Sequence, residues 1–271
     1  MEKYSVLMSV YFRENPTFLF QSLASIFAQS APPDEVVLVK DGQLNPGLDA
    51  VIQQFQHQQP TLQIVHLAKN GGLGKALNEG LQHCSHDLVG RMDSDDLATR
   101  DRFEKQLAVF SQHPELVVVG TWVAEFESDS RIVSGERRVP VSDREIKAMF
   151  ASKCPVNHPS IMFRKAAVIA VGGYLGKYLQ EDYYLWGRLI KGGANFYNIP
   201  ESLVLMRAPI DLFSRRGGWS YAVSELKLQR EFVRLGLFGE LTFLRNAIVR
   251  FIIRIAPNRL RKLLYRTFLR G

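Results

Sequence analysis

The sequence predicts an α/β fold in which helices flank a mostly parallel sheet and a basic, helical C-terminal tail follows. Two observations support this prediction: strand-like and helix-like segments alternate through the first half of the chain, and acidic residues follow two of the strand-like segments. With 271 residues, of which 46% are hydrophobic, the chain is long enough to bury a large core. The expected elements of this half are strands at 5–11, 35–40, 62–67 and 87–92 and helices at 16–29, 48–57 and 73–83.

Several of these elements have local boundary signals. Asn15 can cap the first helix, and Pro16 suits its first position because proline has no N–H group to leave unpaired. The second strand ends in Asp41-Gly42, the third helix begins after Asn70-Gly71-Gly72, and the fourth strand ends at the acidic cluster Asp93-Ser94-Asp95-Asp96. Ligands of open α/β sheets bind beyond the carboxyl ends of the strands, where Asp41 and Asp93 are expected.

The middle of the chain is less regular. We expect an amphipathic helix at 99–111, a strand at 116–121, a short helix at 143–151, and a proline-containing loop at 154–163 that leads into a strand. Gly172-Gly173-Tyr174 is expected to form a turn. A further helix begins at Glu181-Asp182 and ends at Gly192-Gly193, since glycine favours helix ends.

The net charge of +7 is located in the C-terminal part of the chain. Eight basic residues and no acidic residue follow Glu240, so the rest of the chain has 26 basic and 27 acidic residues, a net charge of −1. A nucleic-acid partner is therefore not expected. The basic residues of this tail are Arg245, Arg250, Arg254, Arg259, Arg261, Lys262, Arg266 and Arg270.

The tail contains an apolar segment, residues 241–256, that three arginines interrupt. Charged residues at such spacing disfavour a membrane-spanning helix, because each arginine is costly at the centre of a bilayer. We expect a helix that lies on a membrane surface. The alternative is a helix packed on the body of the protein with its arginines in solvent.

The N-terminus and the cysteines indicate the compartment. No basic region or long apolar stretch of a secretion signal is found at the start of the sequence. Cys84 and Cys154 are too few for a disulfide framework and are not spaced as a zinc site. We therefore expect a cytoplasmic protein, peripheral on the inner face of the membrane.

The cluster Asp93-Ser94-Asp95-Asp96 is the main candidate metal site. Carboxylates crowded at a strand end repel one another, and Mg²⁺ or Mn²⁺ can neutralise them while also binding substrate phosphates. Asp93 and Asp95 are separated by one residue, so on extended backbone they point the same way, whereas Asp96 points elsewhere and could cap the next helix. The alternative is a solvated turn.

Two further segments are candidate donor contacts. The Asp41 carboxylate could accept hydrogen bonds from a nucleobase or a ribose, although an aspartate before glycine is also common in turns. The segment from Asn70 to Lys75 resembles a phosphate-binding loop at a helix start, but Ala76 stands where a true P-loop needs serine or threonine. Lys75 is the candidate phosphate contact.

A carboxylate at Glu181-Asp182 could accept a proton from an attacking hydroxyl, in a setting of aromatic residues that suits a sugar. The alternative is that both acids only favour the helix start. His158 could be a ligand or sugar contact, or a loop histidine with structural bonds. Arg207 and Arg215-Arg216 could bind a diphosphate, or be solvated.

Together these features resemble the inverting family 2 glycosyltransferases of the GT-A fold, in particular bacterial exopolysaccharide enzymes of the amylovoran biosynthesis type. The resemblance covers about residues 4–220. Five motifs carry it in order: Ser9-Val10-Tyr11 with Glu14-Asn15-Pro16, Val39-Lys40-Asp41-Gly42, Asn70-Gly71-Gly72 with Ala76-Leu77-Asn78-Glu79-Gly80, Met92-Asp93-Ser94-Asp95-Asp96, and Gln180-Glu181-Asp182-Tyr183-Tyr184-Leu185-Trp186.

The resemblance implies a role for each acidic residue. Asp41 would contact the base, Asp93 the ribose or the metal shell, Asp95 the metal, and Asp182 would be the general base. Lys40 departs from the pattern, since many relatives have a second aspartate there. Tyr11, Glu14, Asn70 and Lys75 belong to the same donor-binding motifs.

The implied reaction moves a sugar from a nucleoside-diphosphate sugar to an acceptor hydroxyl with inversion. A basic tail suits a lipid-linked acceptor at the inner membrane face. We expect residues 1–97 to bind the nucleotide sugar, 98–220 to bind the acceptor and catalyse, and 221–271 to form the tail.

Two rival functions remain. A sugar-phosphate nucleotidyltransferase would share the sheet and its acids, but it would have a glycine-rich loop directly after the first strand, and residues 11–16 contain no glycine. The other rival is a non-catalytic scaffold that retains a nucleotide-binding fold and docks on membranes through its tail.

Overall fold

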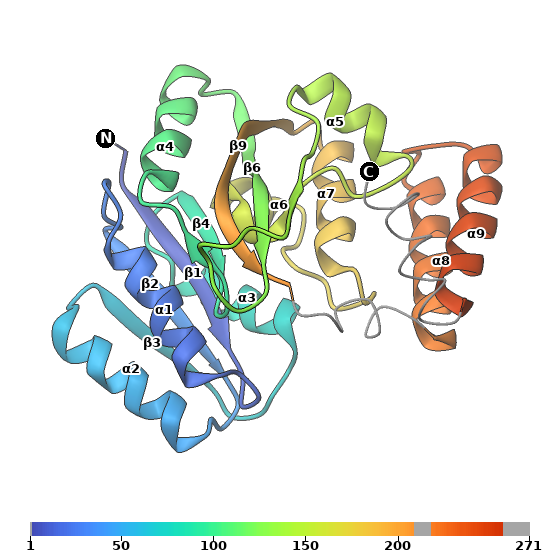
Figure 1. Ribbon diagram of the computed structural model, residues 1–271. Coiled ribbons are helices and arrows are strands. Elements are labelled where there is room, and N and C mark those ends of the chain that lie inside the picture. Colours follow the sequence, from blue (N-terminus) through green and yellow to red (C-terminus); the bar gives the residue numbers. More distant parts are fainter. Residues whose placement is uncertain (1, 209–217, 257–271) are drawn as a thin grey trace.

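The computed structural model describes residues 2–208 and 218–256 (Figure 1). The strands are β1 Tyr4–Val10, β2 Glu35–Asp41, β3 Leu62–Leu67, β4 Leu88–Asp93, β5 Leu97–Ala98, β6 Leu116–Phe126, β7 Gly135–Arg137, β8 Met162–Arg164 and β9 Asn195–Arg207. The α-helices are α1 Pro16–Phe27, α2 Pro46–Gln58, α3 Leu73–His83, α4 Arg102–Gln112, α5 Asp143–Phe150, α6 Lys165–Ala170, α7 Glu181–Lys191, α8 Trp219–Arg234 and α9 Glu240–Ile255, and a 3-10 turn spans His158–Ser160.

Within the described residues the strands form one sheet in the order β3-β2-β1-β4-β8-β6-β9-β5, with β7 paired to β6. The first four strands in this order are parallel, as predicted, and β6 is parallel to β9. The short strands β5, β7 and β8 pair antiparallel to their neighbours. The predicted α/β fold is confirmed, and its antiparallel pairs lie in the second half.

The ends of β1, β2 and β4 meet at one edge of the sheet. Val10 pairs with Lys40, and Ser9 pairs with Asp93. Residues that directly follow these strands are therefore neighbours, although they lie far apart in the sequence. This edge, where the chain order reverses around β1, is the expected position of a ligand site.

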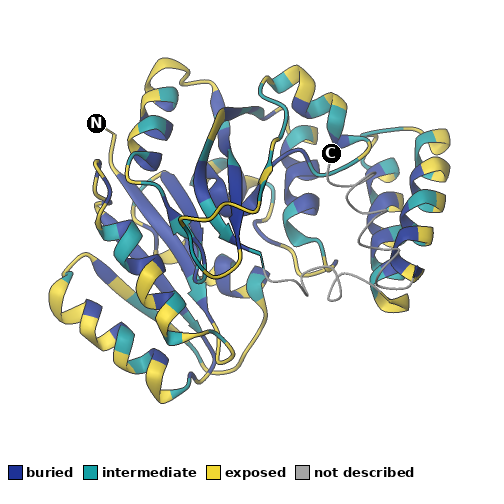
Figure 2. Ribbon diagram, in the orientation of Figure 1, coloured by how far each residue is buried: buried dark blue, intermediate teal, exposed yellow. Residues whose placement is uncertain are grey.

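Helices cover both faces of the sheet and enclose two apolar clusters. Alternate residues of β1 belong to opposite clusters: Val6 and Met8 share a cluster with residues of α1, α2 and α4, and Leu7 shares the other with residues of α3, α7 and α8. Figure 2 shows the sheet as buried and the outer faces of the helices as exposed. This rigid frame holds the loops at the edge of the sheet.

Two of the differences from the sequence prediction concern the elements β9 and α4. The long strand β9 was not predicted, because its sequence Asn-Phe-Tyr-Asn-Ile-Pro-Glu-Ser contains a proline and little alternation, and its register with β6 shifts around Trp122. Helix α4 begins at Arg102 instead of residue 99. The N–H group of Thr99 donates to the carbonyl of Leu203 in β9, so this residue extends the strand pairing.

The C-terminal helices α8 and α9 pack against each other and against the end of α5 (Figure 1). Glu225 of α8 forms ion pairs with Arg250 and Arg254 of α9, and all three side chains are buried. The side-chain amide of Asn246 donates to the carbonyl of Ala151.

In the alternative of a helix packed on the body, the part that places its arginines in solvent is therefore wrong for Arg250 and Arg254. The five bases from Arg259 onward, and Arg215-Arg216, lie outside the described residues. No described helix is both long and apolar enough to cross a bilayer.

Candidate active site

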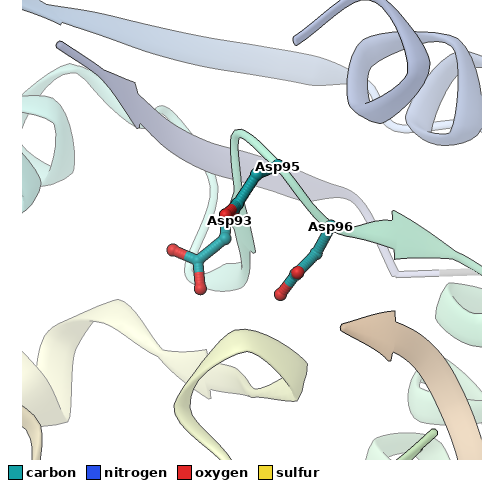
Figure 3. Close-up of side chains that lie close together, drawn as sticks. All are labelled: Asp93, Asp95 and Asp96. Carbon is teal, nitrogen blue, oxygen red and sulfur yellow. The ribbon is translucent and has the colours of Figure 1, made fainter. Parts of the chain in front are cut away.

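The acidic cluster begins at Asp93, the last residue of β4, and continues in the turn that leads to β5. Asp93, Asp95 and Asp96 each contribute a carboxylate oxygen, and these oxygens lie within 4.8 Å of one another (Figure 3). Asp93 and Asp95 are half-buried, whereas Asp96 is only 1% exposed. The alternative of a solvated turn is therefore wrong.

The three carboxylates have different partners. Both oxygens of Asp93 accept hydrogen bonds from the guanidinium of Arg91, a buried residue of the same strand. Asp96 accepts the backbone N–H of Arg207 through Oδ1 at 2.8 Å, and its buried Oδ2 has no partner among the described residues. The side chain of Asp95 accepts no hydrogen bond from another described residue.

The sequence suggested that Asp96 could cap the next helix. The structure shows that it does not. The residue before α4 is Asp101, whose side chain makes no capping bond either. Instead Asp96 holds the end of β9. Arg207 is buried there: its Nε donates to the Asp95 carbonyl at 3.2 Å, and its guanidinium lies over the rings of Phe18 and Phe126.

The cluster is short of positive charge. Burial, together with the charges of Asp93 and Glu14, raises the pKa of Asp95 to about 7. Burial, followed by the charges of Asp93 and Asp95, raises the pKa of Asp96 well above its usual range. A divalent cation would relieve this repulsion, and Asp95 and the unpaired Asp96 Oδ2 are oxygen ligands of the kind that Mg²⁺ and Mn²⁺ prefer. The residues present therefore fit such an ion.

The loop between β1 and α1 lies beside this turn. Glu14 accepts a hydrogen bond from Ser94 Oγ at 2.9 Å, and its other carboxylate oxygen accepts the backbone N–H of Asn15. Tyr11 is 39% exposed at the start of the same loop. The structure thus brings Tyr11 and Glu14 to the edge where the acidic cluster lies.

Asp41 organises the glycine turn before α3. Its two carboxylate oxygens accept the N–H groups of Gly71 at 2.7 Å and Gly72 at 3.0 Å, and its backbone carbonyl accepts the side-chain amide of Asn70 at 3.3 Å. Asp41 is only 4% exposed. Part of the hydrogen-bonding capacity predicted for a nucleobase is thus used within the protein.

Gly42 must be glycine in this arrangement. Its φ of +83° is strained for other residues, and an added Cβ would lie 2.6 Å from the backbone nitrogen of Asn70. Lys75, on the first turn of α3, is exposed and forms no ion pair with a described residue. It remains available for a phosphate.

Asp182 and Asp93 line the same cavity, of about 430 Å³. Asp182 and Glu181 lie at the start of α7, as predicted. Burial, together with the charge of Asp182, raises the pKa of Glu181 to about 7. The cavity therefore joins the predicted general base to the predicted donor site.

His158 lies in the wall of this cavity. Its Nε2 lies 3.0 Å from Tyr174 Oη, and its ring packs against Tyr174 and Trp186. Burial lowers the pKa of His158 well below 6.5, so the ring is neutral. His158 therefore makes the structural contacts of one alternative, and because it also lines the cavity its contact with a sugar stays a prediction.

Several charged residues of the cavity were missed in the sequence, Arg91 and Glu225 among them. Arg91 binds Asp93 and belongs to the strand β4, most of whose other residues are apolar. The sequence feature that could have identified Arg91 as a site residue is its charge among positions expected to be buried. Glu225 belongs to α8, a helix for which the sequence offered no individual site prediction.

Residues 5–172 match the family model described as Glycosyl transferase family 2. The chain is 46% identical to an uncharacterized glycosyltransferase of Haemophilus influenzae over 99% of both chains. It is 38% identical to the UDP-Gal:alpha-D-GlcNAc-diphosphoundecaprenol beta-1,3-galactosyltransferase of Escherichia coli, over 99% of this chain and 97% of that protein. It is 39% identical to the amylovoran biosynthesis glycosyltransferase AmsE of Erwinia amylovora, over 97% of both.

Solved structures share the fold. A mannosyltransferase of Pyrobaculum calidifontis in complex with GDP-Man and Mn²⁺ has a TM-score of 0.66 at 17% identity, over 98% of this chain and 73% of that one. Staphylococcus aureus TarS 1–349 in complex with UDP-GlcNAc has a TM-score of 0.66 at 18% identity, over 93% of this chain and 72% of that one. These likenesses confirm the predicted GT-A fold, and the sequence matches show that the chain belongs to glycosyl transferase family 2.

Proposed function

We propose that the protein transfers a sugar, with inversion, from a nucleoside-diphosphate sugar to a hydroxyl of a lipid-linked acceptor, and that it depends on Mg²⁺ or Mn²⁺. One observation carries this proposal: Asp93, a member of the crowded carboxylates at the end of β4, lines the same cavity as Asp182 at the start of α7. The relative from Escherichia coli, named for a diphosphoundecaprenol acceptor, supports the acceptor class.

In this proposal the donor binds at the edge formed by β1, β2 and β4. Asp95 is the direct metal ligand and Asp93, held by Arg91, assists. When bound, the metal ion neutralises the charge that develops on the leaving diphosphate. Asp41 and Asn70 contact the nucleoside, and Tyr11, Glu14 and Lys75 complete the donor contacts.

Asp182 is the proposed general base. It accepts the proton of the acceptor hydroxyl as the hydroxyl oxygen bonds to the anomeric carbon, and the bond from that carbon to the nucleoside diphosphate breaks on the opposite side. Configuration at the anomeric carbon is thereby inverted. Residues 1–97 serve the donor in this scheme, and 98–220 the acceptor and catalysis.

Replacing Asp95 tests the metal site. We expect Mn²⁺ to tighten binding of one member of a nucleoside-diphosphate panel to the parent protein, measured as a rise in the thermal unfolding midpoint. In Asp95→Asn the affinity in the presence of Mn²⁺ should fall by about tenfold or more, because a charged ligand is lost. Asp101→Asn, a surface change outside the cavity, is the control. Equal stabilisation of both variants by Mn²⁺ and nucleotide would contradict the metal assignment.

We also propose that residues 221–271 dock on the inner face of the membrane, through an apolar stripe on α9. The stripe residues recur every three or four positions on one helix face and are 46–87% exposed: Leu241, Leu244, Ile248, Ile252 and Ile255. Arg245 lies exposed among them, and five bases follow in residues 257–271. Each base near an anionic surface adds about 1 kcal/mol. The buried Arg250 and Arg254 take no part.

Charged substitutions in this stripe test the docking. We expect Ile248→Glu with Ile252→Glu to abolish co-sedimentation with vesicles that contain phosphatidylglycerol, because both changes place a negative charge in the apolar contact. Ile132→Glu is the control, since Ile132 is 69% exposed in a different part of the molecule. Unchanged sedimentation of the double variant would show that the stripe is not the membrane contact.

A further inference from the structure

Arg207 lies where three elements of the donor edge meet. It is the last residue of β9 and is only 8% exposed. Its Nη2 donates to the side-chain oxygen of Gln21 in α1 at 2.9 Å, and its Nε donates to the backbone carbonyl of Asp95 at 3.2 Å. One guanidinium group thus joins β9, α1 and the turn after β4.

The guanidinium group of Arg207 also contacts two aromatic rings. Its central carbon lies 3.7 Å from the ring centre of Phe18 and 4.5 Å from that of Phe126, the residue paired with Arg207 on β6. Each ring attracts the cation and limits its rotation. The Nε–H group is therefore held in its direction toward Asp95.

The carboxylate of Asp95 has few contacts of its own. No other described residue donates a hydrogen bond to this side chain, whereas Asp93 is bound by Arg91. The direction of the Asp95 carboxylate therefore depends on its backbone, whose carbonyl is bound by Arg207. The backbone N–H of Arg207 also binds Asp96 at 2.8 Å, so one strand end contacts two residues of the acidic cluster.

Arg207 acts from outside the cavity. Its neighbour Met206 lines the cavity that contains Asp182, and successive side chains of a strand point to opposite faces of the sheet. The Arg207 side chain packs instead on Phe18 and Phe126. Its contacts are thus with the segment that carries the metal ligands.

We propose that Arg207 is a positioning residue that orients Asp95 for the divalent cation. This inference rests on the proposed metal-dependent sugar transfer and deepens it, because it names the residue that holds the metal ligand in place. The charge of Arg207 has the opposite effect, since a guanidinium beside a cation site repels the metal ion. Lost positioning therefore weakens metal binding, whereas lost charge alone strengthens it.

Mn²⁺ binding to the purified full chain tests this inference. The nucleotide probes are UDP and GDP, and calorimetry measures the affinity for Mn²⁺ with a saturating amount of the one that binds the parent more tightly. We expect Arg207→Met, which keeps an apolar stem but loses every donor, to weaken Mn²⁺ binding by about tenfold, as is usual when a residue that orients a metal ligand is lost. Arg207→Lys can still donate one hydrogen bond and should recover part of this loss. Nucleotide affinity in EDTA should not change.

Two further variants separate positioning from general effects. Arg138→Met removes a guanidinium that lies 4.9 Å from the ring centre of Trp122 and pairs with Glu136, so it matches the chemical change without touching the acidic turn. It should bind Mn²⁺ as the parent does. Gln21→Leu removes an acceptor of the Arg207 guanidinium and should weaken Mn²⁺ binding by about threefold. If Arg207→Met does not fold, Gln21→Leu carries the test, because Gln21 is exposed.

Three results would overturn the inference. Unchanged or tighter Mn²⁺ binding in Arg207→Met, with the parent binding normally, would show that Arg207 does not position Asp95. An equal loss of nucleotide affinity in EDTA and in Mn²⁺ would mean that Arg207 contacts the diphosphate itself. Absence of Mn²⁺ binding by the parent would remove the proposed metal dependence, and this inference with it.

Discussion

Asp182→Asn is expected to slow sugar transfer by about 10²–10⁴-fold, the usual contribution of a positioned general base. Asparagine has nearly the shape of aspartate but cannot accept the proton of the acceptor hydroxyl. Since Asp182 lies at the start of α7 and lines the cavity without contributing to the core, the variant should fold as the parent does. The measurement is the single-turnover rate with saturating donor and acceptor.

The neighbouring Glu181 supplies the matched control. Glu181 lines the same cavity, and burial raises its pKa to about 7. We expect Glu181→Gln to slow transfer much less than Asp182→Asn, and both variants to bind nucleoside diphosphate as the parent does. If Asp182→Asn retained the full rate and Glu181→Gln lost it, the base would be Glu181. Full rates in both variants would contradict a base at the start of α7.

Complete absence of transfer by the parent, despite nucleotide binding, would favour the rival of a non-catalytic scaffold. The other rival, a sugar-phosphate nucleotidyltransferase, is disfavoured because the chain belongs to glycosyl transferase family 2. An active glycosyltransferase and a non-catalytic scaffold differ in the transfer activity of the parent protein, so this measurement separates them before any variant is made.

The donor edge of the fold was predictable because its signals are local. Apolar strands followed directly by Asp41 and by Asp93 identify two strand ends, and parallel pairing then places them at one edge. The partner of Asp96, three positions after Asp93, was not predictable. Arg207 reaches Asp96 across 111 positions of sequence, from a strand whose own sequence lacks alternation. Only the assembled sheet shows that contact.

The C-terminal helix illustrates the same limit with charges. Arg250 and Arg254 interrupt an apolar segment, and from the segment alone they can be interpreted as solvated or as membrane-facing. Their actual environment depends on Glu225, which belongs to another helix. Sequence periodicity describes which residues share a helix face, but the residue that this face meets is a tertiary property.

The Glu225 ion pairs should be essential to the stability of this helix pair. Glu225, Arg250 and Arg254 are 2%, 5% and 4% exposed, so Glu225→Gln removes the buried carboxylate that pairs with both guanidinium groups. The free energy of unfolding should fall by about 3–5 kcal/mol, measured by urea denaturation at pH 7. Glu240→Gln is the control: it removes an exposed pair with Arg230 and should cost less than about 1 kcal/mol.

The pH dependence of the parent gives an independent check. Burial alone would raise the pKa of Glu225, but the charges of Arg250 and Arg254 outweigh it and hold the pKa below its usual value of 4.5. A carboxylate with a lowered pKa in the folded state contributes stability above its unfolded pKa and loses it as the pH falls through the folded value. Glu225→Gln should therefore lose less stability than the parent between neutral pH and pH values below 4.5. An equal loss in both proteins would mean that Glu225 is not held ionised by the two arginines.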